Sequence, residues 1–172
     1  MGNAAIQGSH SSGHDDIDGH WYDYTQMDPS STWASGDMIS TAEGLAKWVL
    51  HLGRGDLLND RYRAEQRQFV NMTGYTNLKY GLGIVYEQDY GLFGHQGGIV
   101  GYSTQMYYVE GEDTALVFLY NRTFPNTIKN FSVVMTYDVL SILFPNRPVP
   151  SQRMGAEMIS VPTGRPGLLN EY

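Results

Sequence analysis

The chain has 172 residues, enough for one domain with a buried core, and its 41% hydrophobic and 17% charged residues argue against disorder. A formal net charge of −7, with 11 Lys and Arg scattered along the chain, argues against nucleic acid and anionic membrane surfaces as partners. Cysteine is absent, which excludes disulfides and thiolate metal sites, and no stretch approaches the roughly 18 apolar residues of a membrane span.

The first 20 residues are polar and contain three of the five histidines, His10, His14 and His20. A metal site and a polar leader or solvated loop are both open. We favour the leader or loop, because no apolar scaffold surrounds these side chains. Residues 21–35 are rich in Trp and Tyr and predict a loop with a turn.

The clearest helix is predicted over residues 40–53. Ser40 and Glu43 have the spacing of a capping box at its start, and Gly53 is a natural stop. One apolar face follows the helical period through Leu45, Trp48, Val49 and Leu52. A second, weaker helix is predicted over residues 59–70.

From residue 80 the pattern changes to that of strands. Four are predicted, over residues 80–87, 90–94, 102–109 and 114–120. The last two form a hairpin, and the acidic cluster in its turn (Glu110, Glu112 and Asp113) favours a solvated turn over a metal site.

A broadly apolar helix is predicted over residues 127–143 and should lie on the face of the sheet. The fold class is therefore α+β, an antiparallel sheet of at least three strands with this C-terminal helix packed on one face and the 40–53 helix nearby. Residues 145–172 are rich in proline and predict an extended tail or linker.

A glycine-rich segment, Gly94-His95-Gln96-Gly97-Gly98-Ile99-Val100-Gly101-Tyr102-Ser103, carries the most chemistry. Its glycines permit a sharp bend and the close approach of a ligand. An exposed strand edge can bind a peptide-like ligand as an added strand, and an inward-pointing N–H can stabilise an oxyanion. From these residues alone, a purely structural bend with one histidine remains the alternative.

Three segments together resemble the class C β-lactamase-like serine hydrolases, a family that includes DD-peptidases and esterases. Gly36-Asp37-Met38-Ile39-Ser40-Thr41 through Leu45 resembles its G-D-M-x-S-T-x-x-D-L stretch, and Tyr80-Gly81-Leu82-Gly83 resembles its Y-G-L-G strand. The segment from Gly94 to Ser103 resembles G-H-x-G-G-x-x-G-[FY]-S. The resemblance covers roughly residues 20–144.

The resemblance implies a partial β-lactamase/DD-peptidase-like fold over residues 21–144, between the leader or loop of 1–20 and the tail of 145–172. It implies that His95, Gln96 and Gly97 form the third catalytic motif on a strand edging the active site. Gly98 would lend its N–H to the oxyanion hole, and His95 would orient or neutralise a substrate carboxylate or the catalytic tyrosine region. It implies neither a cofactor nor a metal.

The family's nucleophile motif, Ser-x-x-Lys, does not occur in these 172 residues, because none of the three lysines follows a serine by three positions. Thr76-x-x-Lys79 and Tyr75-x-Asn77 have the spacing of the first two motifs but stand in the wrong order, and we interpret both as coincidences. We expect both motifs to lie upstream of this chain.

Two serines of this chain lie near the motifs and are alternative nucleophiles. Ser103 begins a predicted strand, and Ser40 is better explained as a helix cap. A Ser-His-Asp triad with His95 and Asp37 stays open, although nothing in the sequence supports it.

Two hypotheses follow. In the first, the chain is the C-terminal portion of a serine hydrolase that acts through an acyl-enzyme on D-amino-acid peptides, β-lactams, amides or esters, and it is inactive alone. In the second, it is a non-catalytic binding or assembly module that pairs through an exposed sheet edge, with another copy or with the missing N-terminal portion. Parents of this type are usually exported, to the periplasm or outside the cell, although the chain carries no signal-peptide core.

Overall fold

The structure is a computed structural model, and it describes residues 6–28, 30, 32–123 and 129–147, with side chains from 135 onwards in the last segment. Its elements in chain order are β1 (His14–Ile17), β2 (His20–Asp23), a 3-10 helix (Trp33–Ser35), α1 (Ala42–Arg54), α2 (Asp60–Gln66), β3 (Val70–Asn71), β4 (Leu78–Tyr80), β5 (Val85–Glu87), β6 (Leu92–Ile99), β7 (Tyr102–Val109), β8 (Thr114–Tyr120) and α3 (Lys129–Leu143). None of the helices in these described segments is long and apolar enough to cross a bilayer.

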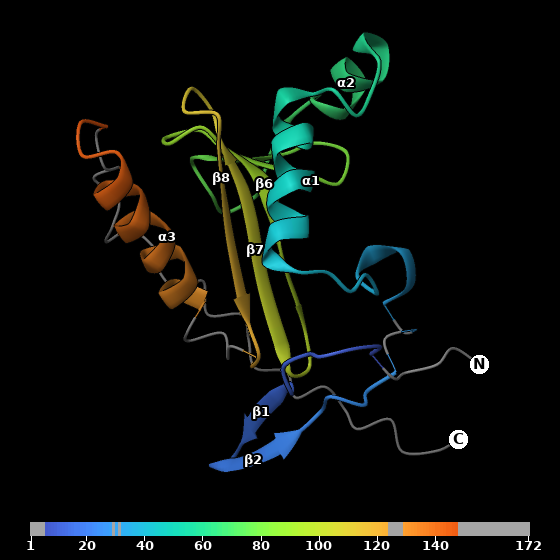
Figure 1. Cartoon of the computed structure of the whole chain (residues 1–172). Coiled ribbons are helices and arrows are strands. Elements are labelled where there is room, and N and C mark those ends of the chain that lie inside the picture. Colours follow the sequence, from blue (N-terminus) through green and yellow to red (C-terminus); the bar gives the residue numbers. More distant parts are fainter. Residues whose placement is uncertain (1–5, 29, 31, 124–128, 148–172) are drawn as a thin grey trace.

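Strands β3 to β8 form one six-stranded antiparallel sheet in sequence order. Helix α1 packs against β6, β7 and β8, and α3 lies on the opposite face (Figure 1). The predicted α+β class is confirmed, with the C-terminal helix on one face of the sheet as expected. The sheet has six described strands, more than the minimum of three that the sequence indicated.

The core lies between the sheet and α3. Leu92, Val109 and Leu116 come from β6, β7 and β8, and they are buried against Leu140 of α3. Burial of each such side chain stabilises the fold by about 1.5–3 kcal/mol. One polar pair is buried here too: Thr136 Oγ1 donates to Gln105 Oε1 at 3.1 Å, which leaves neither group unpaired.

The N-cap of helix α1 lies one residue later in the chain than the sequence predicted. Thr41, not Ser40, is the N-cap, because its side chain accepts the backbone N–H of Gly44 at 3.1 Å. Glu43 does not complete a capping box. It forms an exposed ion pair with Lys47 at 2.6 Å instead.

Helix α1 also ends later than predicted. It passes Gly53 and stops at Gly55, which has the left-handed φ of 78° that favours glycine. Gly53 has a different purpose: a Cβ there would lie 2.1 Å from the ring of Tyr108, so only glycine lets α1 approach the sheet this closely.

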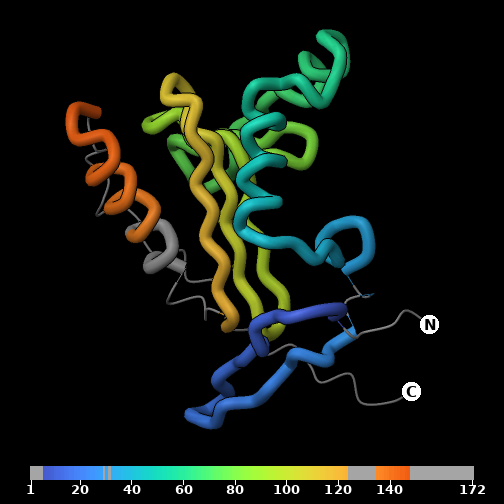
Figure 2. The backbone as a smooth tube through the Cα atoms, viewed as in Figure 1, coloured from blue at the N-terminus to red at the C-terminus, as the bar shows by residue number. Residues whose placement is uncertain are grey.

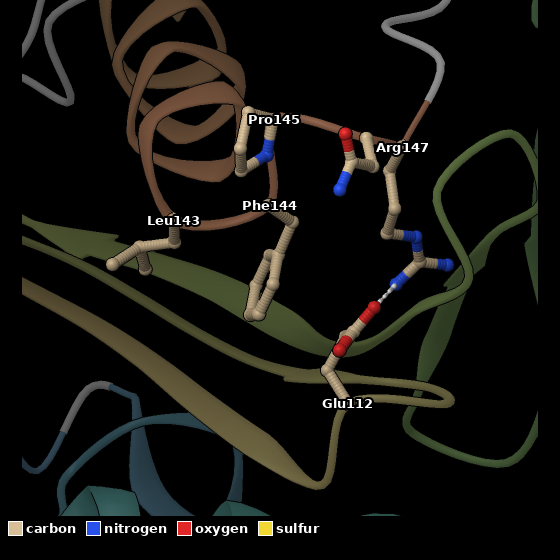
Figure 3. A pocket seen from close by; sticks show the side chains of 6 residues that line it. Glu112, Leu143, Phe144, Pro145 and Arg147 are labelled. Atoms are coloured by element: carbon tan, nitrogen blue, oxygen red, sulfur yellow. Dashed lines mark ion pairs between the residues drawn. The ribbon is translucent and has the colours of Figure 1, made fainter.

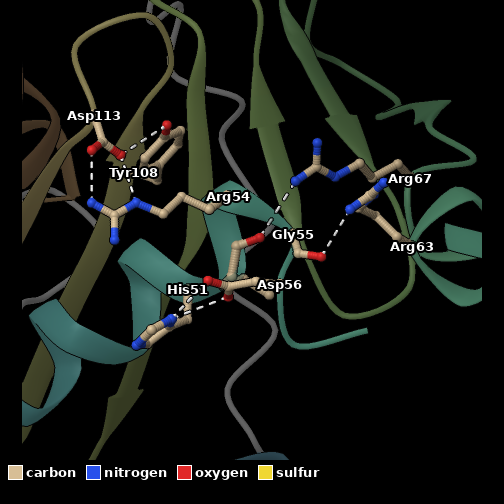
Figure 4. Close-up of polar contacts among 9 residues, drawn as sticks. His51, Arg54, Gly55, Asp56, Arg63, Arg67, Tyr108 and Asp113 are labelled. Atoms are coloured by element: carbon tan, nitrogen blue, oxygen red, sulfur yellow. Dashed lines mark hydrogen bonds and ion pairs between the residues drawn. The ribbon is translucent and has the colours of Figure 1, made fainter. Parts of the chain in front are cut away.

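Two arginines hold the last carbonyls of α1 (Figure 4). Arg63 donates to Gly55 O at 3.1 Å, and Arg67 donates to Gly53 O at 2.8 Å. Because the final helical carbonyls have no intrahelical partner, these guanidinium groups satisfy them and attach α2 and the following segment to α1. Arg54 forms a further ion pair with Asp113 in the β7–β8 turn at 2.7 Å.

The predicted helix over 59–70 is shorter, because α2 ends at Gln66 and Val70 already belongs to strand β3. The single strand predicted over 80–87 is two short strands, β4 and β5. A turn separates them, and Gly83 in it has φ 68°.

The N-terminal hairpin of β1 and β2 forms a separate two-stranded sheet beyond the end of β6–β8 (Figure 2). We expected a leader or loop over 1–20, and β1 lies within that range. The hairpin is tied to the main sheet because His14 N donates to Gly101 O at 3.2 Å and to Asn121 O at 3.0 Å. Most of the predicted tail over 145–172 lies outside the described residues.

Candidate active-site strand edge

The four predicted site residues, His95 to Gly98, follow one another in β6. The sharp bend that the glycines permit does not occur between His95 and Ile99, because β6 runs extended from Leu92 to Ile99 and the chain turns only at Val100-Gly101. The expected short strand over 90–94 is the first part of β6. The glycine-rich segment is therefore extended as far as Ile99, and its remaining residues form the turn and the start of β7.

One edge of this strand is half open. Strand β7 pairs with β6 along its whole length, from Leu92↔Val109 to Ile99↔Tyr102. Strand β5 pairs with β6 only as far as Gly94↔Val85. From His95 onwards, the edge on the β5 side thus has no partner strand in the described part of the chain, and Gln96, Gly97 and Gly98 are exposed.

The alternation of an antiparallel ladder decides which backbone groups face that open edge. Pair Ile99↔Tyr102 flanks a two-residue turn, so these residues exchange hydrogen bonds with each other. Because this direction alternates from one residue to the next, the N–H and C=O groups of Gly97 and His95 also face β7. The N–H and C=O groups of Gly98 and Gln96 therefore point away from β7, towards the open edge.

The glycines of β6 are required for different reasons. A Cβ on Gly94 would lie 2.0 Å from Met106 O of the neighbouring strand, so packing within the sheet demands glycine there. A Cβ on Gly97 would meet nothing within 4 Å, and one on Gly98 would have Tyr102 O as its nearest neighbour at 3.8 Å. Neither has a positive φ. The fold itself thus gives no reason for glycine at 97 and 98, whereas close approach of a ligand backbone does.

Both ring nitrogens of His95 have partners within the chain. Nε2 lies 3.0 Å from the hydroxyl of Tyr80, and Nδ1 is bonded to the backbone oxygen of Gln96. The two rings meet edge to face, with centroids 5.7 Å apart and an interplanar angle of 86°. Tyr80 begins the Tyr-Gly-Leu-Gly segment, but nothing in the sequence marks it as a partner of His95.

A buried carboxylate fixes the turn that leads into β6. Glu87 accepts the backbone N–H groups of Asp89 at 3.0 Å and Tyr90 at 2.9 Å, and its Oε1 also accepts from Asn77 Nδ2 at 2.8 Å. Burial raises the pKa of Glu87, and these hydrogen bonds lower it in part. Burial likewise raises the pKa of Tyr107, opposite Gly94 in β7, to about 12.

Comparison with known proteins shows the family to which the chain belongs. The beta-lactamase family matches residues 4–131. The chain belongs to the beta-lactamase family. No curated protein matches it.

Three solved structures share the fold of this beta-lactamase family chain. A D-stereospecific amidohydrolase from Streptomyces sp. is 26% identical with a TM-score of 0.64, over 70% of this chain and 37% of that one. A D-amino acid amidase from Ochrobactrum anthropi SV3, complexed with D-phenylalanine, is 23% identical with a TM-score of 0.54, over 75% and 44%. A penicillin-binding protein from Bacillus halodurans is 20% identical with a TM-score of 0.55, over 76% and 40%. The chain spans less than half the length of each.

The other candidate residues do not join His95. Ser103 lies opposite Gly98 in β7, but its hydroxyl donates to Arg122 O at 3.0 Å. Ser40 precedes the cap of α1, and its hydroxyl donates to Thr41 O. Because the ring nitrogens of His95 are bonded to Tyr80 and Gln96, neither a serine nor Asp37 is their partner, and the described structure gives no support to a Ser-His-Asp triad.

No cluster of three or more metal-ligand side chains occurs in the described ranges. The acidic residues of the β7–β8 turn have other partners, with Asp113 bound to Arg54 and Glu110 accepting from Tyr86 at 2.9 Å. A surface pocket of about 220 Å³ lies beside this turn, between Glu112, Arg147 and the end of α3 (Figure 3). It shares no residue with the open edge of β6.

Proposed function

We propose that this chain supplies the third-motif strand of a serine hydrolase that works through an acyl-enzyme on D-amino-acid peptides, amides, β-lactams or esters. The observation that supports it best is the open edge of β6. There Gly98 directs both backbone groups outward, and a Cβ on the adjacent Gly97 would meet nothing within 4 Å. Membership of the beta-lactamase family supports hydrolase chemistry in general.

In the proposed role, a substrate lies along the open edge as an added strand. The Gly98 N–H donates to the carbonyl oxygen that becomes negative when the serine attacks. Loss of one such donor typically costs about 2.7–4 kcal/mol of transition-state stabilisation. The Gly98 C=O accepts an amide N–H of the substrate. Gln96 and Gly97 form the surface that the substrate contacts.

The attacking serine and its activating lysine come, in this proposal, from polypeptide outside the 172 residues, since no Ser-x-x-Lys stands within them. The serine oxygen bonds to the carbonyl carbon as its proton passes to the lysine. The C–N or C–O bond then breaks, and the lysine gives that proton to the departing amine or alcohol. Water then releases the acid. The chain by itself is expected to be inactive.

The preference for D-configured substrates is inferred from two of the three structural relatives, a D-stereospecific amidohydrolase and a D-amino acid amidase. Each is similar over less than half of its own length, so the substrate class remains part of the proposal.

Covalent labelling and ligand titration test the proposal together. Intact mass after incubation with a penicillin or an activated ester should show no adduct, and a stoichiometric adduct on a serine of this chain would contradict the proposal.

Titration of the ¹⁵N-labelled chain with D-phenylalaninamide should shift the amide resonances of Gln96 and Gly98 most, and the L-enantiomer should shift them less. The variant Gly98→Pro removes the outward N–H but no bond to β7, and it should abolish the shift of the Gln96 resonance. Largest shifts elsewhere would contradict the proposal.

A second candidate is the binding or assembly module. It is favoured by the position of β8 at the end of the sheet, where only β7 pairs with it among the described strands. Light scattering at several concentrations tests the self-pairing form of this candidate, because pairing of two copies through a sheet edge raises the mass with concentration. A concentration-independent monomer would exclude self-pairing.

A further inference from the structure

We propose that Tyr80 is a positioning residue for His95. Its hydroxyl donates to Nε2 of the tautomer protonated on Nδ1, so that the neutral imidazole offers no N–H to a ligand at the open edge. This inference concerns the site of the proposed function and rests on it for its catalytic meaning.

The tautomer follows from the two partners of the ring. Nδ1 is bonded to the carbonyl oxygen of Gln96, and a carbonyl can only accept, so Nδ1 must carry the proton. In a neutral imidazole the other nitrogen is then an acceptor. The Tyr80 hydroxyl, 3.0 Å from Nε2, therefore donates to it.

The fold places Tyr80 for this contact. It ends β4 opposite Val85, and Val85 lies opposite Gly94, the residue just before His95. Because β5 begins only at Val85, the tyrosine reaches past the start of this short strand to the next position of β6. Both side chains are half-buried, and the edge-to-face arrangement of the rings fixes the orientation of the imidazole.

The consequence concerns which groups a ligand meets. The two protons of the Tyr80–His95 pair are both used within the chain, and the Gln96 carbonyl is occupied as well. The outward donors left on the edge are the N–H groups of Gln96 and Gly98. Neutral His95 thus does not serve as a donor to a substrate carboxylate, which is one of the alternative roles that the family resemblance implies.

The test is ¹⁵N NMR of the histidine ring in the intact chain, recorded at a pH where the imidazole is neutral. We expect a protonated Nδ1 and an unprotonated Nε2 whose resonance is displaced by an accepted hydrogen bond. In Tyr80→Phe that displacement should be lost, whereas Nδ1 should stay protonated, because its bond to the Gln96 carbonyl does not involve Tyr80. Tyr75→Phe is the matched control, since Tyr75 is 52% exposed, and it should change neither signal.

A wild-type ring protonated on Nε2 would overturn the inference without any variant. So would a folded Tyr80→Phe protein whose ring signals equal those of the wild type, with folding checked by its backbone amide spectrum. Since no ligand is needed, this result is independent of the D-phenylalaninamide titration. A correct tautomer with no response at Gln96 and Gly98 would contradict the proposed function alone.

Discussion

At the scale of single residues, the three glycines of β6 separate structural from functional demands. Gly94 is enclosed by the backbone of β7, with Met106 O at 2.0 Å from where a Cβ would stand. Gly97 faces open space, and Gly98 nearly so. One strand therefore carries a glycine that the sheet needs beside two that the sheet does not need.

This contrast gives the first prediction. Gly94→Ala should lower the free energy of unfolding by about 1–3 kcal/mol, because its methyl group has backbone atoms as neighbours that cannot move aside. Gly97→Ala should change it by no more than about 0.5 kcal/mol. Urea denaturation of both variants measures the difference. Equal losses would show that the fold itself also requires Gly97.

Glu87 gives a prediction about pH. Its pKa is raised in the folded protein above the reference value of 4.5, chiefly by burial, so the folded state holds this proton more tightly than the unfolded state. Its contribution to stability is therefore complete below pH 4.5 and declines as the pH rises through the folded pKa.

The variant Glu87→Gln isolates that decline, because glutamine has a similar shape and no charge. The stability of the wild type relative to Glu87→Gln should be highest in acid and should fall towards neutral pH. Thermal or urea denaturation of both proteins from acid to neutral pH gives this difference. A difference that grows with pH would mean that the ionised carboxylate is favoured by its donors more than burial disfavours it.

At the scale of elements, the start of α1 depends on one hydroxyl. Thr41→Ala removes the acceptor for Gly44 N and should cost about 1 kcal/mol. Ser40→Ala is the control, because Ser40 is exposed and its hydroxyl makes only a 3.4 Å contact with Thr41 O, so its loss should be small. Chemical denaturation compares the free energies of unfolding of the two variants. A larger loss in Ser40→Ala would show that Ser40 is the N-cap, as the sequence indicated.

Helices α1 and α3 and strands β7 and β8 were predictable because their signals are local. The apolar period of α1, the hairpin of β7 and β8, and the apolar helix α3 all appear close to their expected ranges. The short strands β3, β4 and β5 were missed or merged, since strands of two or three residues are too short for an alternating pattern to be recognised. Their limits come from pairing with neighbours, which is not a local property.

The candidate site was predictable in part. Membership of the family and the place of His95 to Gly98 at a strand edge followed from three segments in the right order. The extended course of β6 was mistaken for a bend, because glycines suggest turns when their surroundings are unknown. Tyr80 was missed because its contact with His95 joins residues 15 positions apart across two strands.

At the scale of the whole molecule, the open edge is held in place from several sides. Helices α1 and α3 cover opposite faces of β6–β8, as Figure 1 shows. The turn after β6 is fastened to the segment following β8, since Gly101 N donates to Thr123 Oγ1 at 2.6 Å. The segment that begins β1 adds a bond from His14 N to Gly101 O. Packing on both faces and these hydrogen bonds therefore hold the half-open strand in place, which suits a site that must hold donors in fixed positions.

Amide hydrogen exchange along β6, followed residue by residue by NMR in the native chain, tests the open edge most directly. We expect slow exchange at His95, Gly97 and Ile99, whose N–H groups are bonded to β7, and fast exchange at Gln96 and Gly98, whose N–H groups face the open side. Slow exchange at Gly98, at a rate like that of Gly97, would show that its N–H is already engaged and would contradict the proposed oxyanion role.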